Sequence, residues 1–178
     1  MVAKAADLDG TAMSWEEFDA LGEIRAEYID GRVVMAPSPM RRHQTASRRL
    51  ANLLESAVEP GFGVVEAWSW KPGRDEFVPD ILVYPSTDEQ IRYTGTPVLV
   101  VEVLSTSPVG DLVVKINKYA AYGLDRYWVL DPEKRELHVL ARQDSNYELV
   151  RTVTKERAEV DFGAGVARID LTAIIPRD

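Results

Sequence analysis

An apolar run that contains a single charged residue is the feature that most restricts how this chain can fold. Residues 98–104, VLVVEVL, are rich in valine and lie between Pro97 and a Ser/Thr cluster. Such a run is typical of a strand that is buried on both faces of a sheet. An ionised carboxylate at Glu102 is costly there unless it is paired or binds a metal. We therefore expect Glu102 to have a partner.

The residues that follow predict a helix whose polar face offers such a partner. Ser107 and Pro108 fit an N-cap and a first helical position, and Gly123 fits the end of the helix. Polar side chains recur there at three- and four-residue spacing, beside an apolar stripe. The polar face consists of Asp111, Lys115, Lys118, Tyr119 and Tyr122, and the stripe of Leu112, Ile116 and Ala120. A second apolar strand, residues 127–130, completes a strand–helix–strand unit.

Composition is that of an ordinary globular protein of one domain. The chain has 178 residues, of which 46% are hydrophobic and 28% charged. No apolar run approaches the roughly 18 residues that cross a bilayer, and residues 1–10 lack the apolar segment of a secretory signal. We therefore expect no membrane association. The absence of cysteine excludes disulfides and thiol chemistry, and it fits a cytoplasmic location.

The net charge of the chain limits how it could bind nucleic acid. Lys and Arg number 21 against 29 Asp and Glu, a formal net charge of −8. This value argues against a surface that coats nucleic acid in general, but it leaves room for a local basic patch.

The N-terminal third predicts a helix and a hairpin. Residues 1–12 show no periodicity and are expected to be disordered, so that a single domain spans 13–178. Ser14 and Glu17 form a capping box before a short helix, residues 15–21. Asp30-Gly31 then separates two β-favouring runs, residues 24–29 and 32–36, which is typical of a two-residue hairpin.

The remaining elements alternate between helices and strands. A long amphipathic helix is predicted over residues 41–58, ended by Pro60-Gly61. Strands are predicted over residues 63–71 and 77–84 around a turn at 72–75, and over residues 136–141, 147–153 and 166–171. This order predicts an α/β or α+β fold with a central mixed sheet flanked by helices.

The long helix begins with a basic half that has two interpretations. Arg41, Arg42, Arg48 and Arg49 surround His43. The arginines form either a solvated helix face or a contact for a nucleic-acid backbone. His43 either faces a cleft, where it contacts a phosphate or polarises a water, or hydrogen-bonds within the Pro-rich loop before it.

A second carboxylate stands beside the next apolar strand. Asp80 precedes residues 81–83, and this strand is expected to neighbour the strand that holds Glu102. Two carboxylates on adjacent strands offer oxygen ligands to a hard divalent cation, with positions left for water and a phosphate. Lys115 would then orient the water and stabilise charge on phosphorus. Alternatively, Asp80 ends a turn, Glu102 pairs with a lysine, and nothing is catalysed.

Several short motifs follow one another in a fixed order. They are EYIDG at 27–31, APSP at 36–39 with HQ at 43–44, PD at 79–80, VEVLS at 101–105, Asp111 with Lys115 and Tyr119, and YWVLDP at 127–132. In this order they resemble the Uma2 family (DUF820), a branch of the PD-(D/E)XK restriction-endonuclease-like superfamily. The resemblance extends from Met13 to Val139. It implies a restriction-endonuclease-like core and hydrolysis of DNA phosphodiester bonds with Mg²⁺ or Mn²⁺.

The resemblance also assigns roles to residues. It makes Asp80 and Glu102 metal ligands, joined by the backbone carbonyl of Val103. The plain E-x-K pattern of the superfamily would place the lysine at position 104, where this chain has leucine. The family resemblance moves this lysine to the following helix, at Lys115, with Lys118 as the second choice. Glu27 matches an acidic residue that assists catalysis, although the adjacent Asp-Gly turn offers a structural reason for the same match.

Two classes of function therefore compete. The first is a metal-dependent endonuclease, and the second is a catalytically inert nuclease-fold domain that binds DNA or another protein. The presence of all three central residues favours the first, whereas the charge of −8 disfavours strong DNA binding. A glycosidase with two carboxylates would leave the lysine helix unexplained. By analogy with nucleases that make two cuts, we expect a homodimer.

Overall fold

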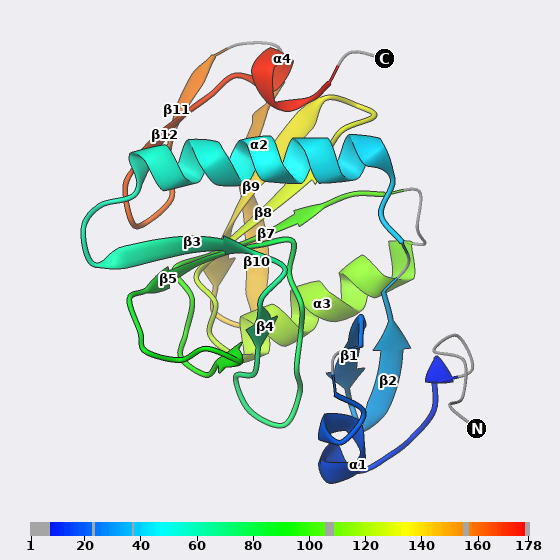
Figure 1. Cartoon of the computed structure of the whole chain (residues 1–178). Coiled ribbons are helices and arrows are strands. Elements are labelled where there is room, and N and C mark those ends of the chain that lie inside the picture. Colours follow the sequence, from blue (N-terminus) through cyan, green and yellow to red (C-terminus); the bar gives the residue numbers. More distant parts are fainter. Residues whose placement is uncertain (1–7, 23, 37, 106–108, 155–156, 177–178) are drawn as a thin grey trace.

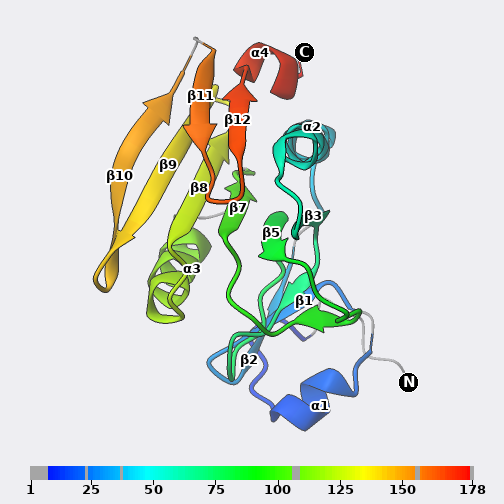
Figure 2. The ribbon, with the colours of Figure 1, turned by 90° about the vertical axis from the view of Figure 1, so that its left-hand side faces the viewer.

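A six-stranded mixed sheet forms the middle layer of the molecule, and helices cover both of its faces (Figure 1, Figure 2). This computed structural model describes residues 8–22, 24–36, 38–105, 109–154 and 157–176. The strand order is β10-β9-β8-β7-β5-β3. The strands are β3 (Phe62–Glu66), β5 (Ile81–Pro85), β7 (Leu99–Val103), β8 (Arg126–Asp131), β9 (Glu136–Gln143) and β10 (Asn146–Val153). Only β7 and β8 are parallel in this sheet, so the predicted mixed sheet is confirmed.

Two helices pack on opposite faces of this sheet. Helix α2 (Arg41–Ala57) buries Ala46, Leu50 and Leu54 in the core on one face, as its predicted apolar stripe requires. Helix α3 (Val109–Ala121) connects β7 to β8 across the other face. Side chains alternate along β7, so Val101 joins the core under α2, while Val100 joins the core on the α3 side. Glu102 therefore lies on the α3 side.

Of the two predicted ends of α3, the structure describes only the C-terminal one. Ser107 and Pro108 lie outside the described residues. At the other end, the helix stops at Ala121, and Gly123 has a φ of 81°. This left-handed conformation suits glycine, which ends helices for that reason. Among the described residues, none of the helices has the length and apolar character needed to span a bilayer.

A hairpin and a short helix form a unit beside the main sheet (Figure 1). Strands β1 (Ala26–Ile29) and β2 (Arg32–Met35) make a sheet of their own, preceded by α1 (Trp15–Asp19) with both bonds of the predicted capping box. Asp30 and Gly31 have φ values of 51° and 76°, as the two central residues of a primed hairpin turn require. Residues 8–12, where we expected no regular structure, contact the hairpin: Gly10 N–H donates to the Val33 carbonyl over 2.8 Å.

The strand predicted over residues 63–71 is divided in the structure. Ala67 has a φ of 51°, which turns the chain out of the main sheet after β3. The following strand β4 (Ser69–Trp70) pairs in parallel with β6 (Arg92–Tyr93), a strand that periodicity did not predict. A two-residue strand is too short to give an alternating pattern, so this pairing is invisible in the sequence.

The C-terminal prediction is also corrected. The strand expected over residues 166–171 ends earlier, as β12 (Val166–Ile169), because Asp170 is the N-cap of α4 (Leu171–Ile174). Its carboxylate accepts a hydrogen bond from Thr172 N–H over 2.9 Å. Strand β12 pairs with β11 (Ala158–Asp161), which the sequence analysis did not anticipate.

The hairpin turn yields a stability prediction. Replacing Gly31 with valine should lower the free energy of unfolding by about 1–2 kcal/mol, because a side chain disfavours the left-handed backbone there. Space is not the obstacle, since the nearest atom to an added Cβ is 3.8 Å away. Urea denaturation measures the change, and Gly31→Asn is the control, because asparagine tolerates this conformation. Equal losses in both variants would contradict the explanation.

Candidate metal and catalytic site

The register of two antiparallel strands brings the two predicted metal ligands together. Ile81 of β5 pairs with Val101 of β7. Continuing this register by one residue places Asp80, the residue directly before β5, opposite Glu102 of β7. Directly opposite residues of antiparallel strands have neighbouring side chains on the same face. The expectation that these carboxylates lie on neighbouring strands is thus met.

Asp80 is held by two hydrogen-bond donors. Its Oδ2 accepts from the backbone N–H of Val103 over 2.7 Å and lies 3.2 Å from Nε2 of His43. His43 stands in the first turn of α2 and points to this carboxylate. Burial lowers the pKa of His43, but the hydrogen bond to Asp80 and the negative charge of Asp80 outweigh burial and raise this pKa overall. His43 therefore faces the carboxylate site.

Glu102 has the partner that its buried position demands. Its Oε1 accepts from Nζ of Lys115 over 3.1 Å and from the hydroxyl of Tyr119 over 2.8 Å. Lys115 also lies 2.8 Å from Oε1 of Glu27, which comes from β1 of the hairpin. The N–H of Val78 donates to the same Glu27 oxygen over 2.8 Å. One lysine on α3 thus joins a carboxylate of the main sheet to a carboxylate of the hairpin.

Burial and charge shift the pKa of both members of this ion pair. Burial, together with the negative charges of Asp80 and Glu27, raises the pKa of Glu102 to about 7, even though Lys115 acts in the opposite direction. Burial lowers the pKa of Lys115, but the negative charges of Glu102 and Glu27 outweigh it and raise this pKa well above its ordinary value. Lys115 therefore stays protonated at neutral pH.

These residues line a cavity of about 340 Å³. The main sheet contributes Asp80, Glu102 and Val103, and α3 contributes Lys115. The hairpin supplies another part of the wall with residues 24–27 and 34–36. Polar groups thus gather in a concave site between the hairpin and the sheet, as expected for a binding or catalytic site.

The donor set of the cavity fits a hard divalent cation. The hydrogen bonds and ion pairs described above use one oxygen of each carboxylate, Oδ2 of Asp80 and Oε1 of Glu102. With Glu27 the site has three carboxylates against the cations of Lys115 and Arg25, so full ionisation of the carboxylates leaves an excess of negative charge that a metal cation would balance. In the part of the chain that the structure describes, no group of three or more His, Cys, Asp or Glu side chains is arranged to hold a metal ion by itself. Mg²⁺ needs no such group, because it commonly binds one or two carboxylates and keeps several waters.

None of the four arginines predicted to contact nucleic acid lines this cavity. Arg41 and Arg48 are exposed on α2, whereas Arg49 donates to the carbonyl of Ala173 over 3.0 Å. Arg42 lines a smaller cavity of about 110 Å³ that it shares with His43.

Arg25 lines the main cavity, and the sequence analysis did not single it out. Its side chain is exposed and makes no hydrogen bond or ion pair with the described residues. It is also the only arginine along the described wall of this cavity. A lone arginine before a strand carries no signal in one sequence, so only the fold could show this position.

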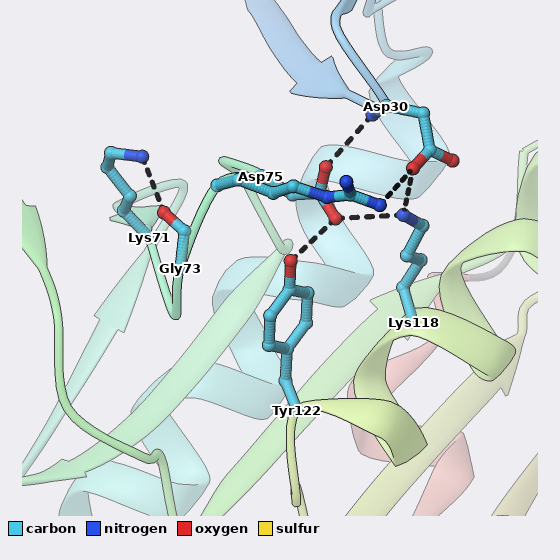
Figure 3. Close-up of polar contacts among 7 residues, drawn as sticks. Asp30, Lys71, Gly73, Asp75, Lys118 and Tyr122 are labelled. Carbon is cyan, nitrogen blue, oxygen red and sulfur yellow. Dashed lines mark hydrogen bonds and ion pairs between the residues drawn. The ribbon is translucent and has the colours of Figure 1, made fainter.

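Lys118, the second candidate lysine, belongs to a different cluster (Figure 3). Its Nζ contacts Asp30 of the hairpin turn and lies 2.9 Å from Oδ2 of Asp75. Asp75 also accepts from the N–H of Asp30 over 2.9 Å and from the hydroxyl of Tyr122 over 2.7 Å. We call these four residues the Asp75 cluster. None of its members lines the main cavity.

The fold and the site together define the class of protein. Three antiparallel strands, a helix and a parallel fourth strand, with Asp80 and Glu102 on adjacent strands, form a restriction-endonuclease-like core.

The comparisons agree with this class. The family model Uma2, described as "Putative restriction endonuclease", matches residues 15–171, and the chain belongs to this family. Its fold is similar to a crystal structure titled "putative nuclease belonging to DUF820", from Anabaena variabilis ATCC 29413. The TM-score is 0.75 at 20% sequence identity, over 91% of this chain and 97% of that chain. No curated protein matches the chain.

The buried carboxylate of Asp75 yields a pH prediction. Burial raises the pKa of Asp75, but the bonds from Asp30, Lys118 and Tyr122 outweigh it and lower this pKa overall. Ionised Asp75 therefore stabilises the folded state above the ordinary aspartate pKa of about 3.9, and this contribution is lost as the pH falls through the lower value of the folded state.

Chemical denaturation at a series of pH values measures this contribution. The difference in unfolding free energy between wild type and Asp75→Asn should stay constant above about pH 5 and shrink below about pH 4. Asp88→Asn, at an exposed loop position, serves as the control. A difference that does not change with pH would rule out a role for the charge of Asp75.

Proposed function

We propose that this chain is a metal-dependent endonuclease that hydrolyses phosphodiester bonds of DNA. The observation that carries the proposal is the pairing of Asp80 with Glu102 across β5 and β7, with Nζ of Lys115 3.1 Å from Glu102 in a cavity of about 340 Å³. Membership in the family described as "Putative restriction endonuclease" supports the same reaction class.

Asp80, Glu102 and the backbone carbonyl of Val103 are the proposed ligands of Mg²⁺ or Mn²⁺. Such an ion, when bound, polarises a phosphate and lowers the pKa of a water molecule. His43 and the N–H of Val103 fix the Asp80 carboxylate from one side, which leaves its Oδ1 to face the cation. Tyr119 fixes Glu102 in the same way.

Lys115 is proposed to act as a charged hydrogen-bond donor. Its raised pKa keeps the ammonium protonated, so it does not act as a general base at neutral pH. A protonated lysine beside the scissile phosphate orients the attacking water and stabilises the negative charge that develops in the transition state. Glu27 assists by holding the ammonium in place over 2.8 Å.

The DNA backbone is proposed to contact Arg25 at the cavity wall and the beginning of α2, where Arg41 and Arg42 lie. Arg48 and Arg49 stand further along α2, and Arg49 already donates to Ala173. Local positive charge of this kind can bind phosphates even though the chain as a whole carries −8. A homodimer, in which two such sites cut two strands, is part of this proposal.

A second candidate is an inert nuclease-fold domain that binds DNA or another protein. The contacts of Glu102 favour this candidate, because Lys115 and Tyr119 already donate to its Oε1 and pair the carboxylate without a metal. A purely structural ion pair would have the same geometry. The two candidates differ in whether a divalent cation binds and whether DNA is cleaved.

Cleavage of supercoiled plasmid and of single-stranded DNA with Mg²⁺ or Mn²⁺ tests the first candidate. Asp80→Asn, Glu102→Gln and Lys115→Met should each lower the cleavage rate by about 100-fold or more, because each removes charge that the reaction needs. Mg²⁺ should raise the melting temperature of wild type but not of Asp80→Asn.

Matched controls come from the turn after β8 and the start of β9. Lys134→Met and Glu136→Gln change the same residue types outside the cavity and should keep full activity. Cleavage that persists in Asp80→Asn would refute this site. If wild type does not cleave DNA and Mg²⁺ does not raise its melting temperature, the inert-domain candidate is favoured.

The role of Arg25 is tested by DNA binding without metal. Arg25→Ala should weaken binding to a fluorescent duplex and reduce the slope of log Kd against log salt by about 1, because one phosphate contact is lost. Arg168→Ala, an exposed arginine of β12 outside the cavity, is the control. If Arg25→Ala and wild type bind the duplex equally well, Arg25 does not contact DNA.

A further inference from the structure

Two lysines, one turn apart on α3, each join the hairpin to the body of the molecule. They are spaced by three residues, and so are the two hairpin acids that they contact. In each case the lysine also reaches a buried carboxylate outside the hairpin. The two sets are Glu27, Lys115 and Glu102, and Asp30, Lys118 and Asp75. The proposed catalytic lysine thus has a structural parallel at the next turn of its helix.

The second set is not explained by the proposed chemistry. The Asp75 side chain has no exposed surface, and three donors from two segments, the hairpin turn and the C-terminal end of α3, converge on it. A buried ionised carboxylate is costly, so such a cluster is better suited to fixing one geometry than to adding stability. Figure 3 shows Lys118 of α3, Tyr122 just after α3 and Asp30 of the hairpin turn meeting around Asp75.

The hairpin needs this kind of attachment. It forms a separate two-stranded sheet, and a two-stranded hairpin is marginally stable by itself. Its backbone is joined to the segment before β5 by one reciprocal pair of hydrogen bonds, 2.8 Å each, between Tyr28 and Glu76. The position of the hairpin decides where Glu27 meets Lys115 and where Arg25 lines the cavity.

We propose that the Asp75 cluster is a positioning device for the active site, which holds the hairpin so that Glu27 stays on Lys115. Lys118, Asp75 and Tyr122 are thus positioning residues and not catalytic ones. Loss of the cluster lets Glu27 withdraw, and Lys115 then pairs with Glu102 alone. A tighter pair of that kind competes with the cation for Glu102. The consequence for cleavage rests on the proposed function, whereas the consequence for Glu27 does not.

Amide hydrogen exchange tests the position of Glu27 without any activity. The N–H of Val78 reports it, because this group donates to Glu27 Oε1. Asp75→Asn should speed exchange at Val78 about tenfold relative to the amides of β8. Tyr122→Phe, which removes one hydrogen bond and keeps the ring, should give a smaller increase in a variant that stays folded. Unchanged relative exchange at Val78 in both variants would overturn the proposal.

A double-mutant cycle tests the link to catalysis. Introduced into wild type, Asp75→Asn should lower kcat about tenfold. Introduced into the Glu27→Gln variant, it should change kcat hardly at all, because both substitutions act through the contact between Glu27 and Lys115. Lys118→Arg should restore more activity than Lys118→Met. Asp170→Asn, which disturbs the α4 cap and its ion pair with Arg157, is the control for general destabilisation and should keep kcat.

The two proposals can fail separately. Losses in kcat that multiply in the double variant would show that Asp75 acts only through overall stability, and would overturn the positioning role. A wild type that never cleaves DNA would refute the proposed function. Exchange at Val78 would still decide whether the Asp75 cluster positions Glu27.

Discussion

The buried contact between Glu102 and Lys115 is the interaction on which the arrangement of this molecule depends. Glu102 lies in an apolar sheet, where an ionised carboxylate must be paired, and Lys115 reaches it from the helix packed on the same face. This requirement fixes the rotation of α3 against β7. It also brings Glu27 into the site, because Lys115 extends beyond Glu102 to the hairpin.

Structure and proposed chemistry share these contacts. Three carboxylates outnumber the cations of Lys115 and Arg25 in the cavity, and donors such as Val103 N–H, Tyr119 and His43 stabilise the individual oxygens of Asp80 and Glu102. The same excess favours a divalent cation. Membership in the Uma2 family and the restriction-endonuclease-like core agree with a site of this type.

Local patterns sufficed for elements whose signal lies within a few residues. The capping box at Ser14, the turn at Asp30 and Gly31, and the apolar stripe of α2 were all predicted because short-range geometry decides them. The divided strand at Ala67 was missed, since a single left-handed residue has no periodicity. The helix start at Leu171 was missed because Asp170 reads as part of an alternating strand.

The sequence by itself determined that Glu102 needs a partner, that a lysine helix follows, and that ordered motifs match one family. Only the tertiary structure decided which carboxylate each lysine contacts: Lys115 reaches Glu102, whereas Lys118 reaches Asp75, 43 residues away in the chain. Helical spacing places both lysines on one face, and one turn of rise separates their ammonium groups. Which carboxylate each one meets depends on how β7, the turn before β5 and the hairpin pack against α3, long-range contacts that no local pattern encodes.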